Sequence, residues 1–321
     1  MTTDPASAGD PLDLDHALRV AIHAAEEAAR IQRTHLGGEL DIGTKSSVTD
    51  LVTLVDRACE ARIREIVLDA YPDHVVLGEE EGQLGEARSR WIVDPLDGTL
   101  NYAHGFPFYC VSIALEVDGR IELGVVLDTP RDVLFEAVRG RGARANGRPI
   151  AVTTETEPIQ AMLATGFAYV EGTQHENLGV FARVLPKVRA VRRPGAAALD
   201  LCYVPAVNLD GFWELKLSPW DVAAGWLIVQ EAGGTVTGGD GAPYRLGQRV
   251  IVASNGHLHG RLLELLDLGT VTAGKQRPDR SPPAGVRREP LFAASADLAC
   301  AEERRLAPSP DRRSPVGARA P

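Results

Sequence analysis

Cysteine and aromatic residues are scarce in this chain of 321 residues. The four cysteines, Cys59, Cys110, Cys202 and Cys300, form no CxxC pair and have no histidine close to them. The sequence therefore indicates neither a zinc site nor a disulfide framework. Aromatic residues make up only 5% of the chain, so a folded core must consist mainly of Val, Leu, Ala and Ile.

Long apolar runs and an excess of positive charge are also lacking. No run reaches the roughly 18 to 20 apolar residues that a membrane helix needs. The first twelve residues contain Asp but neither Lys nor Arg, which is not the pattern of a signal peptide. The 34 Lys and Arg against 44 Asp and Glu give a formal net charge of −10, which argues against nucleic acid or an anionic membrane as the main partner. We therefore expect a cytoplasmic protein.

The chain has one long stretch of balanced composition, followed by a stretch of a different kind. Residues 269–321 hold eight of the 21 prolines and ten Lys or Arg against six Asp or Glu. This composition predicts a mostly disordered tail at 269–321, after a folded domain at 13–268 and a flexible N-terminus at 1–12. A basic peptide that docks elsewhere is the alternative interpretation of the tail.

Helical and strand-like patterns alternate within the folded domain. Apolar residues recur at helical spacing over residues 13–35 and again in the run that follows Thr49 and stops at Pro72. Further helices are predicted at 174–185, 195–207, 219–232 and 256–268. Strand-like runs joined by short links, which indicate antiparallel hairpins, are found at 109–117, 121–127 and 133–138. This interleaving favours an α+β fold of layered helices and sheets over a doubly wound parallel sheet.

Acidic residues stand at the ends of apolar runs, among residues that favour turns. The run 91–93 leads into Asp94-Pro95-Leu96-Asp97-Gly98-Thr99, and the run 74–77 leads into Gly78 and the glutamates 79–81. Asp221 follows Ser218-Pro219-Trp220, a pattern typical of a capped helix start. Each of these three segments also has an ordinary structural explanation. The segment at 94–99 fits a surface turn, the glutamates 79–81 fit a solvent-exposed corner, and the segment at 218–221 fits a capping box. If these carboxylates form one site without His or Cys, that site would select a hard cation, Mg²⁺ first and Mn²⁺ second.

Together these segments resemble the inositol monophosphatase family of magnesium-dependent, lithium-sensitive phosphomonoesterases. The matching segments, in the family's order, are KSSVTDLVTLVD, LGEEEG, WIVDPLDGTLNY, PFYCVSIAL, GVVLDTPRDVLFEAVRGRGARANG, RRPGAAALDLCYV and PWDVAAGWLIVQEAGG. The resemblance covers residues 13–268, and the pairing of DPLDGT with PWDVAAG is highly specific. It implies a layered αβαβα sandwich with a catalytic domain at 13–268, usually assembled as a homodimer.

The resemblance also implies a metal site. It assigns Glu79, Asp94 and the backbone carbonyl of Leu96 to one Mg²⁺, and Asp94, Asp97 and Asp221 to a second. A third ion on Glu79 would offset the charge of a bound phosphate, so we expect two or three ions.

The same resemblance assigns catalytic and substrate-binding residues. Asp56 and Thr99 are expected to orient the attacking water, and Glu80 to orient water at the metal. The implied substrate contacts come from Asp97, Gly98, Thr99, Gly195, Ala196 and Glu214. Relatives commonly carry Ser or Thr at the position of Ala196, so one hydrogen bond to a polyol would be missing here.

These features predict Mg²⁺-dependent hydrolysis of a small phosphorylated polyol or sugar, with inositol 1-phosphate as the first substrate. Fructose 1,6-bisphosphate, histidinol phosphate and NADP are alternative substrates, because the family's metal and phosphate motifs are shared while pocket residues diverge. An RNA-binding or transcription-complex-binding homologue is the alternative from a different class. The negative charge of the folded domain argues against RNA binding, whereas the basic tail at 269–321 is compatible with it.

Overall fold

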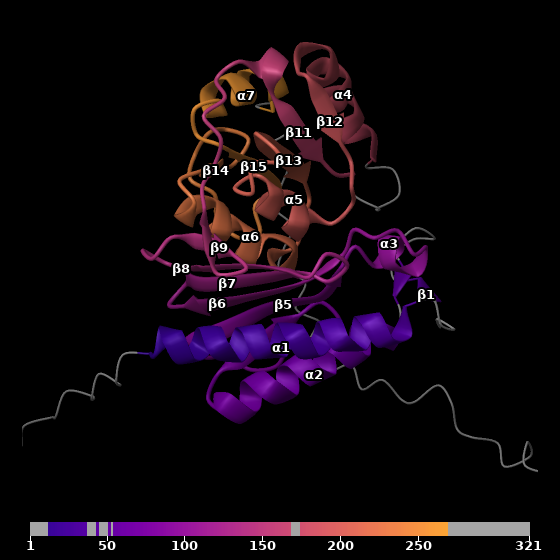
Figure 1. Cartoon of the computed structure of the whole chain (residues 1–321), viewed down its shortest axis with the longest axis vertical. Coiled ribbons are helices and arrows are strands. Elements are labelled where there is room, and N and C mark those ends of the chain that lie inside the picture. The colour runs from indigo at the N-terminus through magenta and orange to yellow at the C-terminus, as the bar shows by residue number, and fades with distance from the viewer. Residues whose placement is uncertain (1–11, 37–42, 45–50, 53, 168–173, 269–321) are drawn as a thin grey trace, which may run out of the picture. The chain divides into compact units, whose positions relative to one another are not determined.

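The computed structural model describes residues 12–36, 43–44, 51–52, 54–167 and 174–268. The predicted tail at 269–321 and the predicted flexible N-terminus at 1–12, except Leu12, lie outside the described residues. In the described part, helices and sheets alternate as helices, an eight-stranded sheet, helices, a five-stranded sheet and helices (Figure 1). The predicted αβαβα sandwich is confirmed.

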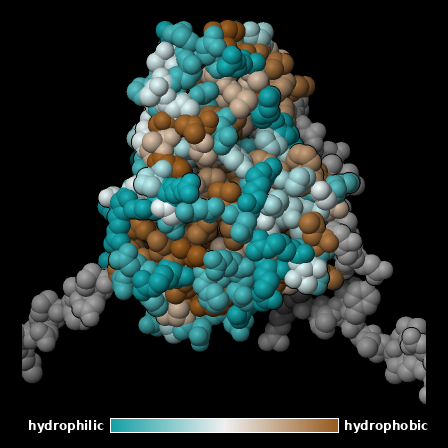
Figure 2. All heavy atoms as spheres, in the orientation of Figure 1, coloured by the Kyte–Doolittle hydropathy of each residue, from teal (hydrophilic) through white to brown (hydrophobic). Residues whose placement is uncertain are grey.

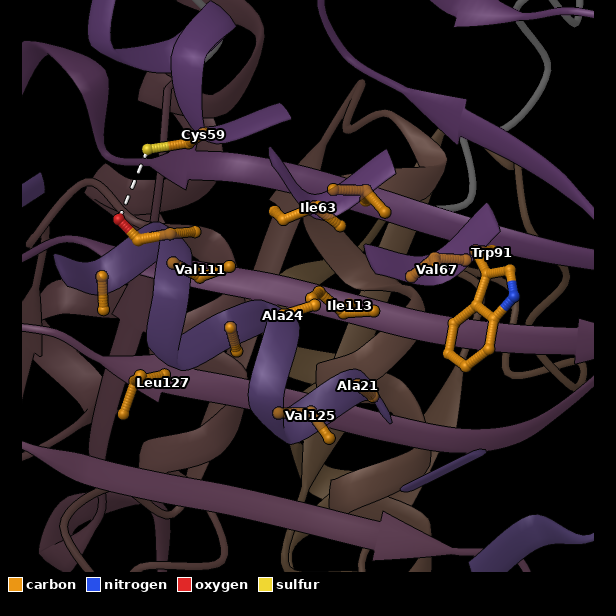
Figure 3. Packing of buried hydrophobic residues seen from close by; sticks show 14 of the residues in the cluster. Ala21, Ala24, Cys59, Ile63, Val67, Trp91, Val111, Ile113, Val125 and Leu127 are labelled. Carbon is orange, nitrogen blue, oxygen red and sulfur yellow. Dashed lines mark hydrogen bonds between the residues drawn. The ribbon is translucent and has the colours of Figure 1, made fainter. Parts of the chain in front are cut away.

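The first helical layer consists of α1 (Leu14–His35) and α2 (Leu54–Ala70). Both helices were predicted, but α2 begins only at Leu54, because Leu51–Val52 forms strand β2, paired antiparallel with β1 (Gly43–Thr44). Alanines fill the buried face of α1, so this helix can approach the sheet closely. Figure 3 shows side chains of both helices packed on strands of the sheet, among them Ala21, Ala24, Cys59, Ile63, Val67, Val111, Ile113, Val125 and Leu127.

The eight-stranded sheet forms the second layer. Its strands, in spatial order, are β10 (Arg148–Ile150), β9 (Ala143–Ala145), β8 (Val133–Val138), β7 (Arg120–Asp128), β6 (Cys110–Val117), β5 (Ser89–Asp97), β3 (Val75–Gly78) and β4 (Gly82–Gln83). Neighbours are antiparallel except β3 and β5, which are parallel. The predicted hairpins are confirmed in β6, β7 and β8. Asp118 and Gly119, at φ 51° and 76°, form the two-residue turn between β6 and β7, as a type I′ turn requires.

The middle layer holds α5 (Ala197–Tyr203) and α6 (Pro219–Glu231) between the two sheets. Helix α6 contacts β5 to β8 on one side and β14 and β15 on the other. Its run VAAGWLIV is apolar on nearly every face, as expected for a helix that is covered all round. The predicted helix 195–207 is shorter in the structure, since Pro205 lies shortly after its end.

The five-stranded sheet and the outer helices complete the fold. The strand order is β12 (Ala190–Arg192), β11 (Met162–Thr165), β13 (Gly211–Leu215), β15 (Val250–Ser254) and β14 (Thr235–Thr237). The remaining helices are α3 (Thr99–Ala103), α4 (Gln174–Val184), α7 (His259–Leu266) and the short 3₁₀ helices Pro158–Gln160 and Leu185–Lys187. Strand β11 is parallel to both β12 and β13, and the other pairs are antiparallel.

Most of the described side chains on the face shown in Figure 2 are hydrophilic. On the face shown in Figure 2, hydrophobic side chains gather between them at the level of the eight-stranded sheet. In the described ranges, every helix is too short or too polar to cross a membrane.

Candidate active site

The proposed acidic ligands gather where β3 and β5 end side by side. Because β3 and β5 are parallel, with Gly78 opposite Val93, Glu79 and Asp94 come next along neighbouring strands. Asp97 is the last residue of β5, and the register between β5 and β6 shifts between Asp94 and Asp97. Two apolar runs that are separate in the sequence thus deliver their acids to one edge of the sheet.

Asp94 is the buried centre of this group, with 2% of its surface exposed. Burial raises the pKa of Asp94 well above its ordinary value, and the charges of four other carboxylates raise it further. In order of effect these are Glu79, Asp97, Asp221 and Asp56. The structure therefore brings Glu79, Asp97, Asp221 and Asp56 within electrostatic reach of Asp94.

Asp97 and Asp221 are both held by backbone N–H groups. The Asp97 Oδ2 atom accepts a hydrogen bond from Ala198 N at 2.7 Å, and the Cys110 thiol donates to it at 3.7 Å. Burial raises the pKa of Asp97 to about 7, while the Ala198 N–H opposes this rise. Asp221 lies in the first turn of α6 and accepts from Ser218 N at 2.7 Å, as the predicted capping box requires. Burial and the charge of Glu79 raise the pKa of Asp221 well above its ordinary value.

These carboxylates are neighbours, but they are not arranged in a metal-coordination geometry. Within the ranges that the structure describes, no group of three or more His, Cys, Asp or Glu is arranged so that it could hold a metal ion. One Asp94 oxygen accepts from Leu96 N at 3.1 Å, and Asp97 and Asp221 also bind backbone N–H groups. The chemistry of the donor set nevertheless fits a hard cation. All donors are oxygens. Burial and, after it, repulsion between neighbouring carboxylates raise the pKa values of Asp94, Asp97 and Asp221, and a divalent cation would relieve this repulsion.

The turn after Asp97 carries the proposed phosphate contacts. Gly98 has a φ of 91°, and a Cβ atom there would lie 2.9 Å from the Phe108 carbonyl oxygen, so only glycine fits. Thr99 begins α3, and its hydroxyl donates to the Leu96 carbonyl at 3.0 Å. Leu96, Gly98 and Thr99 therefore share one short turn beside Asp97.

The two other proposed catalytic residues are Asp56 on α2 and Glu80 in the turn after β3. Asp56 is buried in the first turn of α2, close enough for its charge to raise the pKa of Asp94. Glu80 follows Glu79, and its Oε2 atom lies 3.8 Å from the Arg57 Nε atom. Helix α2 thus presents Asp56 to the carboxylate group and Arg57 to Glu80.

Of the remaining predicted substrate-contacting residues, Glu214 lies on β13, and Gly195 and Ala196 directly precede α5. The Glu214 carboxylate lies against Gly166, where a Cβ atom would come within 2.2 Å of both its oxygens. Burial raises the pKa of Glu214 to about 8, and the charge of Arg193 opposes this rise. Ala196 is the N-cap of α5 and is buried in an apolar cluster, so its side chain offers no hydrogen bond to the helix or to a polyol.

Sequence reasoning missed three polar residues near the site. Asn101 donates to the carbonyls of Phe108 at 2.7 Å and Pro194 at 2.9 Å, which joins α3 to the segment before α5. Asp200 is 1% exposed, and neither carboxylate oxygen has a hydrogen-bond partner among the described residues. Glu60, fully buried on α2, binds the turn after β3. A charged residue inside an apolar run, as in AALDLCY, was the only available signal for Asp200.

Comparison with known proteins agrees with this arrangement. The chain is 41% identical to the Inositol-1-monophosphatase of Synechocystis over 269 residues, which covers 83% of this chain and 94% of that protein. It is 44% identical to the Nus factor SuhB of Pseudomonas aeruginosa over 248 residues, covering 74% and 91% of the two chains. The crystal structure of the extragenic suppressor protein suhB from Bartonella henselae matches with a TM-score of 0.76 at 39% identity, covering 79% and 99%.

The family comparison covers the same span as the described fold. A sequence model described as the Inositol monophosphatase family matches residues 13–269, which is most of the chain and includes every residue of the candidate site. The chain therefore belongs to the inositol monophosphatase family.

Proposed function

We propose that this protein hydrolyses small phosphorylated polyols in a Mg²⁺-dependent reaction, with inositol 1-phosphate as the first substrate. The observation that carries the proposal is the convergence of Glu79, Asp97, Asp221 and Asp56 on the buried Asp94. Like charges that gather around a buried carboxylate are costly without compensation, so a site that brings five carboxylates together favours a bound cation.

Glu79, Asp94 and the Leu96 carbonyl would hold one ion, and Asp94, Asp97 and Asp221 a second. These donors are the oxygens that Mg²⁺ prefers, and Mn²⁺ would be accepted by the same set. A third ion on Glu79 belongs to the same proposal. Such cations lower the pKa of nearby water and neutralise charge on the phosphate and the leaving oxygen.

Thr99 and Asp56 are suited to orient the attacking water. The Thr99 hydroxyl donates its proton to the Leu96 carbonyl, so its oxygen is left to accept a hydrogen bond from water. An ionised Asp56 also accepts, so the two residues would bind both protons of one water and direct its lone pair at the phosphorus. Gly98 and Thr99 would contact the phosphate, and Glu80 would help to orient water at the ions.

Glu214 and the start of α5 would contact the alcohol part of the substrate. A carboxylate accepts hydrogen bonds from polyol hydroxyls, and Glu214 lies close enough for its pKa to respond to Asp97. Gly195 and Ala196 would contribute backbone groups only, because the Ala196 side chain carries no hydroxyl. Because this hydrogen bond to a polyol is missing, fructose 1,6-bisphosphate, histidinol phosphate and NADP remain alternative substrates.

Substitution of Asp94 tests the metal assignment. Asp94→Asn keeps the size of the side chain and removes one charge, so we expect Mg²⁺-dependent phosphate release to fall by about a thousandfold or more while the far-UV spectrum stays unchanged. Asp132→Asn, a change at an exposed aspartate, is the matched control and should keep parental activity. Activity of Asp94→Asn within tenfold of the parent would contradict the assignment. A substrate panel measured with the parent identifies the preferred phosphate ester.

A second candidate function is suggested by the 44% identity to a protein named Nus factor SuhB. On this hypothesis the chain binds a transcription-related partner or RNA. The ten basic residues of 269–321 favour such binding, and the formal charge of −10 for the whole chain opposes it.

The proposal includes a cytoplasmic homodimer. Phe106, 53% exposed, and Val207, 65% exposed, are large apolar side chains that an interface between two copies would cover. Light scattering coupled to size exclusion would measure the mass directly, and a mass near the single-chain 34.4 kDa would contradict the dimer.

A further inference from the structure

A buried carboxylate on α2 binds the turn that follows β3. Glu60 is 0% exposed. Its Oε2 atom accepts a hydrogen bond from Glu80 N at 2.7 Å, and its Oε1 atom accepts one from Glu81 N at 3.0 Å. These two N–H groups belong to the residues directly after Glu79. The backbone of the turn is therefore fixed by a charged acceptor, which gives stronger hydrogen bonds than a neutral one.

Arg64 completes this arrangement one turn further along α2. Its Nε atom donates to Glu60 Oε1 at 2.9 Å, and its guanidinium also donates to the carbonyls of Val76, at 3.2 Å, and Gly82. Val76 lies in β3 and Gly82 begins β4, so both ends of the turn are bound. We call Glu60 and Arg64 the α2 clamp.

Gly78 shows how closely the clamp approaches the strand. A Cβ atom at this position would lie 2.3 Å from Glu60 Oε1, a distance that no side chain tolerates. The glycine of LGEEEG therefore leaves room for the Glu60 carboxylate. The LGEEEG motif therefore requires glycine for packing as well as its acidic residues.

We propose that Glu60 is a positioning residue for divalent-cation binding, because the α2 clamp fixes the turn carrying Glu79 and Glu80 relative to Asp56. Asp56 and Glu60 are four residues apart and share one face of α2. Figure 3 shows Ile63 and Val67 of this helix among the apolar residues packed on the sheet, and Cys59 hydrogen-bonded to the neighbouring helix α1 at the Ala28 carbonyl. Glu79 is repelled by neighbouring carboxylates, so a turn without the clamp would move away from the site. This inference rests on the proposed Mg²⁺ dependence.

Glu60→Gln tests the proposal with little change in volume. The amide keeps one acceptor and replaces the other by a donor, so a backbone N–H of the turn loses its partner. We expect the Mg²⁺ dissociation constant, measured by titration calorimetry, to rise by about tenfold or more. At saturating Mg²⁺ we expect kcat to return to within about threefold of the parent, because Glu60 acts on ligand position and not on the reacting atoms. Glu65→Gln, at an exposed glutamate of the same helix, is the matched control and should bind Mg²⁺ like the parent.

Arg64→Lys provides a second variant in case Glu60→Gln does not fold. It keeps the charge but loses the forked contacts to Val76 and Gly82, so a smaller weakening of Mg²⁺ binding is expected. A folded variant of either kind that binds Mg²⁺ as tightly as the parent would overturn the role of the clamp and leave the proposed function intact. A parent that binds no Mg²⁺ and releases no phosphate would overturn both.

Discussion

At the scale of single residues, the raised pKa of Asp97 makes the stability of the cation-free protein depend on pH. The ordinary pKa is 3.8 and the folded-state value is about 7, mainly because of burial. The folded protein therefore binds this proton more tightly than the unfolded chain does. The resulting contribution to stability is complete below about pH 4 and is lost as the pH rises through 7.

Asp97→Asn should therefore stabilise the protein at pH 8 in the presence of EDTA, by a few °C in melting temperature. Added Mg²⁺ should raise the melting temperature of the parent and leave that of the variant nearly unchanged, because ligand binding stabilises only a competent site. Asp118→Asn is the control. Arg88 lowers the pKa of the exposed Asp118, so removal of this charge should not raise the melting temperature. Equal melting temperatures of parent and Asp97→Asn at pH 8 would show that Asp97 carries no unfavourable charge.

Some features of the site could be predicted from a local sequence pattern, and others depend on segments that are distant in the sequence. Ser218, Pro219 and Asp221 form a capping pattern that is visible in the sequence and present in the structure. The capping pattern did not show that the Asp221 carboxylate also faces Glu79 and Asp97; only the family resemblance placed it in a shared metal site, because these segments meet only in the folded chain. Asn101 and Glu60 were missed for the same reason. Their partners are backbone groups of distant segments, and backbone groups have no sequence signature.

At the scale of elements, periodicity predicted most helices and hairpins, and tertiary contacts decided their ends. The strands β6, β7 and β8 were predicted because short links with turn residues join them. The parallel pair of β3 and β5, on which the site depends, has no such local signal. The run at Leu51–Val52 was assigned to a helix by its apolar pattern but pairs with β1, since a short apolar run fits either structure.

The contact between α3 and the segment before α5 gives an element-scale prediction. Asn101 binds the carbonyls of Phe108 and Pro194, so Asn101→Ala leaves buried acceptors without a donor. We expect a loss of about 1–3 kcal/mol in the free energy of unfolding, measured with urea. We also expect a higher KM for the phosphate ester, because the start of α5 borders the proposed substrate pocket. Asn208→Ala, at an exposed asparagine, should change neither quantity. An unchanged KM with lowered stability would limit Asn101 to a structural role.

At the scale of the whole molecule, catalysis and any binding of nucleic acid should be separable. Every residue assigned to the site lies between Asp56 and Asp221, and the family match ends at residue 269. Removal of 275–321 takes away ten basic and six acidic residues, which changes the formal charge from −10 to −14. We expect kcat/KM for phosphate release to stay within about twofold, because none of the removed residues has a proposed role in the reaction.

The same truncation tests the second candidate function. If the full chain binds single-stranded RNA in a filter assay, the affinity should fall steeply with salt and be lost on removal of 275–321, because the remaining chain is strongly acidic. Full-length and truncated chains that bind RNA equally would place the contact on the folded domain. A more than tenfold loss of phosphate release on truncation would instead contradict the separation, because it would assign the removed residues a part in the enzyme's own chemistry.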